Sequence, residues 1–161
     1  MIENIEGLLT AFAESARAVK LMPVLPSLRH EVLRAPHKPP PRLPVGYAAV
    51  YIFSLSGDYG AGCPAGANRV LKVGKVGANS SARFCSQHYL PNSANSNLAR
   101  SVINEKVLWA YLGISTLDES TVKSWMLAHL ERDHIFVPAG EGTEREIERY
   151  CRGRLGPVFE G

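Results

Sequence analysis

The sequence predicts an α+β domain, a small mixed or antiparallel three-stranded sheet flanked by helices, with an N-terminal helical extension. Three observations support this class. Two β-rich runs follow one another in the middle of the chain, segments with helical periodicity surround them, and a third β-rich run separates two later helices. The 161 residues suffice for one domain core and are too few for two.

The N-terminal segment has the pattern of an amphipathic helix. Between Ile2 and Met22, apolar residues recur at steps of three and four, which places them on one helical face. Pro23 and Pro26 end this helix, because proline lacks an amide hydrogen and clashes with the preceding turn. Residues 27–33 can form a second short helix. The apolar face of the first helix can pack on the domain's own core, or it can contact a protein partner or a second copy of the chain.

Five prolines lie between Pro36 and Pro44 and favour an extended, polyproline-like segment. We interpret this segment as a spacer, although a proline-rich strap can also serve as a ligand for an aromatic-lined groove. It divides the chain into an N-terminal part, residues 1–45, and a domain that spans residues 46–161.

Two strands are predicted from the runs YAAVYIFSL, residues 47–55, and RVLKVGKVG, residues 69–77. The glycine-rich loop between them contains Asp58 and Cys63 and is longer than the commonest hairpin turns, so their pairing is an inference. The capping residue types at positions 79–81 predict a short helix that begins near Ser80.

Three further helices and one strand follow. Residues 98–112 have helical spacing, and Gly113 supplies a stop. Capping boxes at 116–119 and 143–146 predict a helix that runs through Leu130 and another that ends at Gly156. The run HIFVP, residues 134–138, predicts a third strand between these two helices.

Composition excludes some classes of protein. No apolar run approaches the roughly 18 residues of a membrane span, and the first residues are acidic, unlike the basic start of a signal peptide. We therefore expect a cytoplasmic protein without a membrane partner. The three cysteines are Cys63, Cys85 and Cys151, an odd number with unequal spacing that favours reduced thiols.

The formal charge of +3 indicates no partner by itself, but its distribution is uneven. Residues 46–104 hold five basic residues and one acid, a charge of +4, whereas residues 1–45 carry +2 and residues 105–161 carry −3. A local positive surface of this kind favours a phosphate-bearing ligand.

Five residues occur in the order and approximate spacing of the GIY-YIG nuclease pattern. They are Tyr51 late in the first β-rich run, Gly74 and Lys75 in the second, Arg83 on the next helix and Glu148 on the last. Over residues 46–159 the chain therefore resembles the GIY-YIG nuclease family. Each motif alone is weak, and the specificity lies in the ordered set.

The resemblance implies a metal-dependent endonuclease that hydrolyses phosphodiester bonds in nucleic acid, DNA in preference to RNA. Tyr51 then activates or positions the attacking water, Arg83 grips the scissile phosphate, and Glu148 is the one protein ligand of a Mg²⁺ or Mn²⁺ ion. His88 or Tyr89 would fill a further position of the family. We also expect two lysines to take part in catalysis, Lys72 and Lys75, and three further residues to bind the substrate, Arg69, Gly74 and Arg100.

The sequence departs from the family at two places. Lys72 replaces the usual tyrosine of the second motif, and residues 156–161 replace a usual asparagine. Lys72 can accept a proton only where its pKa is lowered, which leaves Tyr51 or a metal-bound water as the better base. The alternative is therefore a catalytically impaired module on the same fold that binds nucleic acid or another protein.

Each site residue also has a structural alternative. Tyr51 can pack on the core, Arg83 can form a surface ion pair, and Glu148 can pair with a neighbour on its own helix. The spacing of Cys85 and His88 hints at zinc or a thiol nucleophile, but the sequence offers no second close ligand pair and no evidence of a lowered thiol pKa.

Overall fold

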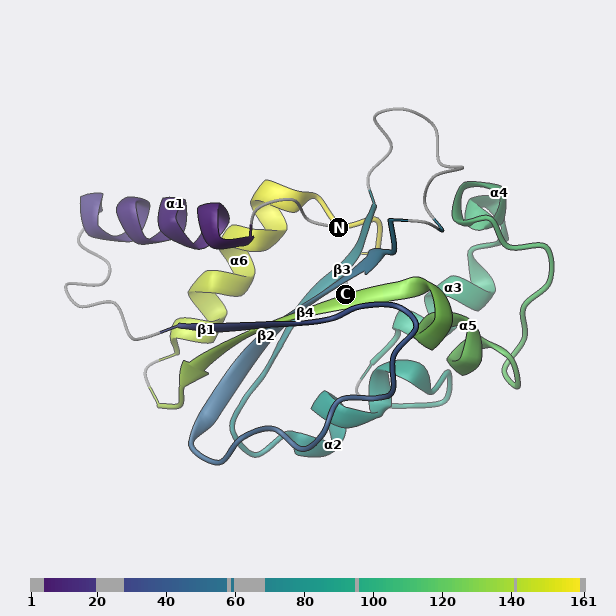
Figure 1. Ribbon diagram of the computed structural model, residues 1–161, viewed down its shortest axis with the longest axis horizontal. Helices are drawn as coiled ribbons and strands as arrows, with labels where there is room; N and C mark the ends of the chain where they lie inside the picture. The colour runs from purple at the N-terminus through teal and green to yellow at the C-terminus, as the bar shows by residue number, and fades with distance from the viewer. Residues whose placement is uncertain are drawn as a thin grey trace.

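The computed structural model describes residues 5–19, 28–57, 59, 69–94, 96–140 and 142–159. Its centre is an antiparallel sheet of four strands in the order β1-β4-β2-β3 (Figure 1). The strands are β1 (Arg29–Leu33), β2 (Tyr47–Leu55), β3 (Val70–Val76) and β4 (Leu130–Pro138). The α+β class and the antiparallel pairing of β2 with β3 are confirmed, and the predicted strand number of three is wrong.

The additional strand is β1, which lies where a short helix was predicted over residues 27–33. Its five residues pair with β4 from Arg29 opposite Phe136 to Leu33 opposite Arg132. This pairing joins residues about 100 positions apart and leaves no signal in the local sequence. The division of the chain at residue 46 stays a prediction; in the structure, β1 from the first part pairs along β4 of the second.

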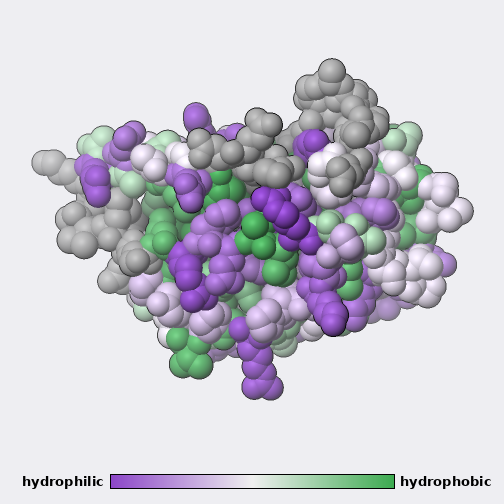
Figure 2. Space-filling view, viewed as in Figure 1, coloured by the Kyte–Doolittle hydropathy of each residue, from purple (hydrophilic) through white to green (hydrophobic). Residues whose placement is uncertain are grey.

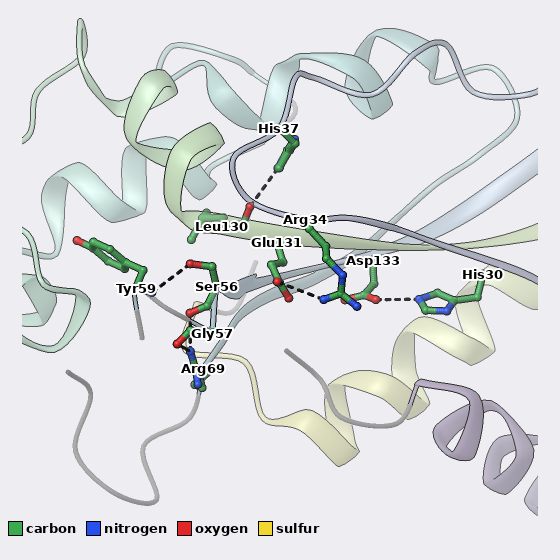
Figure 3. Close-up of polar contacts among 10 residues, drawn as sticks. All are labelled: His30, Arg34, His37, Ser56, Gly57, Tyr59, Arg69, Leu130, Glu131 and Asp133. Atoms are coloured by element: carbon green, nitrogen blue, oxygen red, sulfur yellow. Dashed lines mark hydrogen bonds and ion pairs between the residues drawn. The ribbon is translucent and has the colours of Figure 1, made fainter. Parts of the chain in front are cut away.

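Strand β4 is longer than predicted and begins at Leu130 instead of His134. Its first half contains Glu131, Arg132 and Asp133, and all three are buried in the sheet. Their charges resemble those of a helix surface in the sequence. In the structure, the two acids are satisfied from the β1 side, because Asp133 accepts a hydrogen bond from His30 at 2.8 Å and Glu131 one from Arg34 at 3.4 Å (Figure 3).

Helices cover both faces of the sheet (Figure 1). One face carries α1 (Ile5–Ala18) and α6 (Thr143–Leu155), and the other carries α2 (Ser81–Cys85), α3 (Leu98–Asn104) and α5 (Val122–His129). Ala48 through Leu55 of β2 are all buried, since this strand has a hydrophobic core on each side. The two cores hold β2 and β3 in place.

The apolar face of α1 packs on its own chain. Ile5, Phe12 and Ala16 are buried, and the rings of Phe12 and Tyr150 of α6 meet edge to face with centroids 5.5 Å apart. Of the two roles expected for this face, the structure therefore displays packing on the domain's own core. The described residues do not include either predicted end of this helix, namely Ile2 and Met22, or the two prolines that follow it, Pro23 and Pro26. They also do not include Asp58, Cys63, Glu160 and Gly161.

The predicted helix starts are only partly right. Helix α5 begins at Val122 and not near residue 117, because Asp118 accepts hydrogen bonds from the backbone nitrogens of Ser120 and Thr121 in a turn before the helix. Helix α6 begins at Thr143 as predicted, but the Thr143 side chain does not cap it. Neither capping box therefore forms.

Two segments predicted as single helices are divided. Residues 98–112 form α3, the 3₁₀ helix η3 (Lys106–Leu108) and α4 (Trp109–Leu112). The segment after Ser80 forms α2 and the 3₁₀ helix η2 (Gln87–Tyr89). The predicted stops at Gly113 and Gly156 are confirmed, with left-handed φ angles of 67° and 52°.

The proline-rich segment, residues 35–44, contains neither helix nor strand and runs against the domain. The His37 backbone nitrogen donates to the Leu127 carbonyl at 2.9 Å, and His37 Nε2 donates to the Leu130 carbonyl at 3.1 Å (Figure 3). Leu43 is buried in the core beside α2. In the part of the chain that the structure describes, no helix combines the length and the apolar character needed to cross a membrane.

Candidate functional site

A pocket of about 290 Å³ lies at the β3 edge of the sheet, where residues of β2, β3, α2, α3 and α6 meet. Because β3 is an edge strand, elements from both faces of the sheet reach the same space. We call this space the edge pocket. The predicted site residues that line it are Tyr51, Lys72, Gly74, Arg83, Arg100 and Glu148.

Tyr51 reaches the pocket by crossing Gly74. The two residues are directly paired between β2 and β3. A β-carbon on residue 74 would lie 2.3 Å from the Tyr51 hydroxyl oxygen, closer than any two such atoms can approach. Glycine at this position therefore lets the tyrosine ring extend past the edge strand. This explains on steric grounds why a glycine stands opposite the tyrosine.

The Tyr51 hydroxyl is buried and makes no hydrogen bond within the described part of the chain. Burial raises the pKa of Tyr51, and the positive charges of Arg83 and Arg132 oppose this rise. The Arg83 charge acts at short range, although no hydrogen bond joins the two groups. The hydroxyl therefore stays protonated at neutral pH and can donate a hydrogen bond to a ligand.

Lys72 is 4% exposed and donates a hydrogen bond from Nζ to Oδ1 of Asn97. Burial, together with the charges of Arg83 and Arg152, lowers the pKa of Lys72 to about 8. The residue that replaces the second-motif tyrosine thus points into the edge pocket. It is neutral in a substantial fraction of molecules at mildly alkaline pH.

The edge pocket carries more positive than negative charge. Lys72, Arg83 and Arg100 line it, whereas Glu148 is the one acidic side chain among its described lining residues. Arg100 donates from Nε to the Pro91 carbonyl at 3.0 Å, which leaves its two terminal nitrogens out of that bond. Arg152 lies 3.9 Å from Glu148 on α6. This surplus of cations matches an anionic ligand such as a phosphate.

Lys75 and Arg69 do not line the pocket. Lys75 is paired with Val50, whose side chain belongs to the core under α1 and α6, so it projects from the opposite face of the sheet. Arg69 donates to the carbonyls of Ser56 and Gly57 and thereby holds the end of β2 (Figure 3). The structure brings neither residue to the predicted site.

His88 and Tyr89 lie behind the pocket, not in it. The His88 ring packs against the Tyr51 ring with centroids 4.2 Å apart, and its Nδ1 is hydrogen-bonded to the Ser96 hydroxyl at 2.7 Å. Burial and the charges of Arg132 and Arg83 hold the pKa of His88 well below its usual value, so the ring is neutral. Tyr89 is completely buried and its hydroxyl accepts from Arg132 at 3.5 Å.

Sequence reasoning missed two residues that shape the site. Asn97 is the last residue of the polar run PNSANSN, residues 91–97, and holds Lys72, but this run by itself does not indicate a pocket residue. Arg132 is fully buried, with its guanidinium carbon 5.4 Å from the centre of the Tyr51 ring and 5.0 Å from that of Phe53. An arginine between Glu131 and Asp133 gives no sequence signal of such burial.

The donors of the pocket fit a hard divalent cation better than zinc. Glu148 supplies one carboxylate, and Mg²⁺ commonly uses one or two carboxylates together with waters and substrate phosphates. The described residues contain no cluster of three His, Cys, Asp or Glu side chains. Cys85 donates instead to the Pro41 carbonyl at 3.2 Å, and His88 is engaged with Ser96, so this pair forms no zinc site.

Comparison with known proteins finds no matching family model, no matching curated protein and no matching solved structure.

Proposed function

We propose that the protein is a metal-dependent endonuclease that hydrolyses phosphodiester bonds in nucleic acid, DNA in preference to RNA. The observation that carries the proposal is the position of Tyr51, Lys72, Arg83 and Glu148. These residues come from four elements and line one pocket of about 290 Å³, and three of them, Tyr51, Arg83 and Glu148, match an ordered nuclease pattern. Scattered positions for these side chains would have removed the basis of the proposal.

The arginines of the edge pocket bind the scissile phosphate. Hydrolysis builds negative charge on the phosphoryl oxygens, so preorganised cations at this position stabilise the transition state more than the ground state. The planar guanidinium of Arg83 matches two phosphate oxygens, and Arg100 adds a second guanidinium at the same pocket.

Glu148 is the residue that would hold the metal. A bound Mg²⁺ or Mn²⁺ ion supplies Lewis-acid stabilisation of charge on the reacting oxygens. The carboxylate also offsets part of the positive charge of Lys72, Arg83 and Arg100 when no substrate is bound. Its contact with Arg152 at 3.9 Å orients it along one side of α6.

Tyr51 and Lys72 share the handling of the attacking water. The protonated Tyr51 hydroxyl orients the water by a hydrogen bond. Lys72, with its pKa lowered to about 8, takes the proton when it is neutral, and its bond to Asn97 keeps the amine directed into the pocket. Tyr51 is the less available base here, because burial raises its pKa and keeps the hydroxyl protonated at neutral pH.

The test incubates the purified full chain with labelled single-stranded, duplex and branched DNA and with RNA, in Mg²⁺, Mn²⁺ or EDTA. We expect metal-dependent cleavage that Glu148→Ala abolishes and that Arg83→Ala lowers by at least about 10²-fold. Lys75→Ala is the matched control, since Lys75 lies on the same strand as Lys72 but projects from the other face. Cleavage that persists in both site variants would show that this pocket is not the catalytic site.

The second candidate function is a nucleic-acid-binding module without catalysis. The feature that favours it is Lys72 in place of the second-motif tyrosine. This candidate predicts salt-sensitive binding of nucleic acid that Arg83→Ala weakens, with no cleavage in any metal. Turnover in the same preparations excludes it.

A further inference from the structure

A second hollow, of about 520 Å³, adjoins the edge pocket. The two spaces share Ser93 and Ala94 as a common wall. We call this space the side hollow. The residues that carry the argument about it are Gln87, Leu90, Pro91, Asn92 and Glu119.

The two spaces differ in charge. Three cations line the edge pocket, whereas the described residues that line the side hollow include one acid, Glu119, and no cation. A phosphate bound in the side hollow would have no counter-charge and would be repelled by the carboxylate. The part of a nucleic acid that suits the hollow is therefore an uncharged part next to a phosphate.

The side chains of the hollow match the two surfaces of a nucleobase. Leu90 is 43% exposed and adjoins Pro91, which offers apolar contact to the face of a ring. Gln87, which is half-buried, brings an amide side chain to the lining. Amide side chains pair with the donor and acceptor groups on base edges, and apolar or aromatic contact holds the base face.

The wall between the two spaces is held in place from three sides. Arg100, which lines the edge pocket, donates to the Pro91 carbonyl at 3.0 Å. Asn92 donates to Glu119 Oε2 at 3.2 Å, and Ser96 is hydrogen-bonded to the buried His88 at 2.7 Å. These bonds give the side hollow its shape before a ligand arrives, which lowers the entropic cost of binding.

We infer that the side hollow binds an unpaired nucleobase of the nucleotide adjacent to the phosphate in the edge pocket. The inference rests on the proposed function, because it needs a nucleic acid in the edge pocket. A base within a duplex is stacked and paired, and its edge and face cannot enter such a hollow together. The substrate class is therefore single-stranded or branched nucleic acid with an unpaired nucleotide next to the cleaved bond.

The test measures binding in EDTA, without cleavage, by fluorescence anisotropy. One probe is a short labelled single strand of DNA, and the other is an abasic strand of the same length and charge. We expect the wild-type chain to bind the base-bearing strand about ten-fold more tightly, the affinity that stacking of a single base supplies. Leu90→Ala and Gln87→Ala should reduce this ratio toward one.

Asn104→Ala is the matched control, because Asn104 is exposed at the end of α3 and lines neither space. It should preserve the ratio. Arg100→Ala should weaken binding of both strands, because it removes a cation from the edge pocket, and should also lower the ratio, because it removes the bond to the Pro91 carbonyl. Leu90 is exposed, so its variant is expected to fold, and a thermal melt confirms this.

Two results overturn the inference and are distinguishable. A ratio that stays at about ten in both Leu90→Ala and Gln87→Ala, or a wild-type ratio of one, shows that the side hollow binds no base while the proposed function stands. Failure of the wild-type chain to bind either strand contradicts the proposed function and the inference together.

Discussion

The two edges of the sheet differ in how the charges of their side chains are balanced. At the β1 edge, the buried acids Asp133 and Glu131 are matched by His30 of β1 and by Arg34, which follows β1 (Figure 3). Hydrophilic side chains also gather across the middle of the molecular face where β1 runs (Figure 2). Charge at this edge is balanced within the protein, and its role is to join β1 to the sheet.

At the β3 edge, three cations converge on a pocket with one carboxylate. Electrostatic repulsion among Lys72, Arg83 and Arg100 costs stability, and the burial of Lys72 adds to that cost. Charged residues of the same types are therefore balanced by partners at the β1 edge and are in excess at the β3 edge, which supports the proposal that the β3 edge binds an anionic ligand. Substitutions at matched positions on the two edges test this distinction.

The largest expected effect is that of Arg83→Ala on cleavage. Loss of its guanidinium from the edge pocket should lower kcat by about 10²- to 10³-fold, since removal of one preorganised transition-state donor costs this much in enzymes. Single-turnover cleavage of labelled DNA measures the change. Arg34→Ala at the β1 edge is the comparison variant and should retain kcat while losing no more than about 1 kcal/mol of stability. Equal losses of activity in the two variants would remove the distinction between the edges.

Gly74→Ala is expected to damage the site and the fold together. The new methyl group would lie 2.3 Å from the Tyr51 hydroxyl, so the ring must leave its position. We expect a loss of about 1–3 kcal/mol in the free energy of unfolding, as for overpacked cores, and a large loss of cleavage. Gly77→Ala on the same segment meets no atom within 4 Å and should change both quantities little. Urea unfolding and cleavage assays of both variants measure these two quantities. A Gly74→Ala variant with the stability and the cleavage rate of the wild-type chain would refute the placement of Tyr51.

Lys72→Met should stabilise the protein at pH 7 while it lowers cleavage by about 10²-fold, the loss expected of a general base. The folded-state pKa of Lys72, lowered to about 8, lies below the unfolded value of 10.5, so folding favours the neutral amine. This contribution to stability is present above pH 10.5 and is lost as the pH falls through about 8. At pH 7 the buried charge therefore destabilises the fold, on the order of 2 kcal/mol.

Urea unfolding of both proteins between pH 7 and pH 10.5 measures this effect. The advantage of Lys72→Met should shrink as the pH rises, because the wild-type amine becomes neutral. Wild-type cleavage should increase through pH 8 for the same reason. A gap between the two proteins that does not change with pH would show that Lys72 is not a perturbed amine.

The smallest effect concerns His134, which packs between Phe84 and Phe136 with ring centroids 4.7 Å and 5.7 Å away. Burial and the nearby charges of Arg132, His37 and His30 lower the pKa of His134 to about 2. Its contribution to stability is present above pH 6.5 and is lost as the pH falls toward 2. His134→Phe should therefore be less sensitive to acid, by about 1–2 kcal/mol at pH 5. Parallel slopes of stability against pH in the two proteins would contradict the low pKa.

Local sequence patterns were sufficient for part of the fold. The continuous apolar run of β2 reflects cores on both of its sides, and Gly113 and Gly156 end helices because they adopt left-handed φ angles. Strand β1 and the first half of β4 were missed for a shared reason. The buried acids of β4 find their partners, His30 and Arg34, on a distant segment of the chain, which no local pattern records.

The candidate site divides in the same way. Tyr51, Lys72, Arg83 and Glu148 were identified in advance because each sits at a recognisable place on a strand or helix, and the structure brings them to one pocket. Lys75 was expected beside them, but strand alternation sends it to the other face. Asn97 and Arg132 act through tertiary contacts, with Lys72 and the Tyr51 ring respectively, that the sequence does not reveal.

The most direct test of the central claim is cleavage of labelled single-stranded DNA by the wild-type chain and by Glu148→Gln, each in Mg²⁺ and in EDTA. The variant keeps the size of the side chain and removes the charge. We expect cleavage by the wild-type chain in Mg²⁺ alone and none by Glu148→Gln, with both proteins binding the DNA. Cleavage by the wild-type chain in EDTA, or equal cleavage by Glu148→Gln in Mg²⁺, would contradict the claim that the edge pocket is a metal-dependent nuclease site.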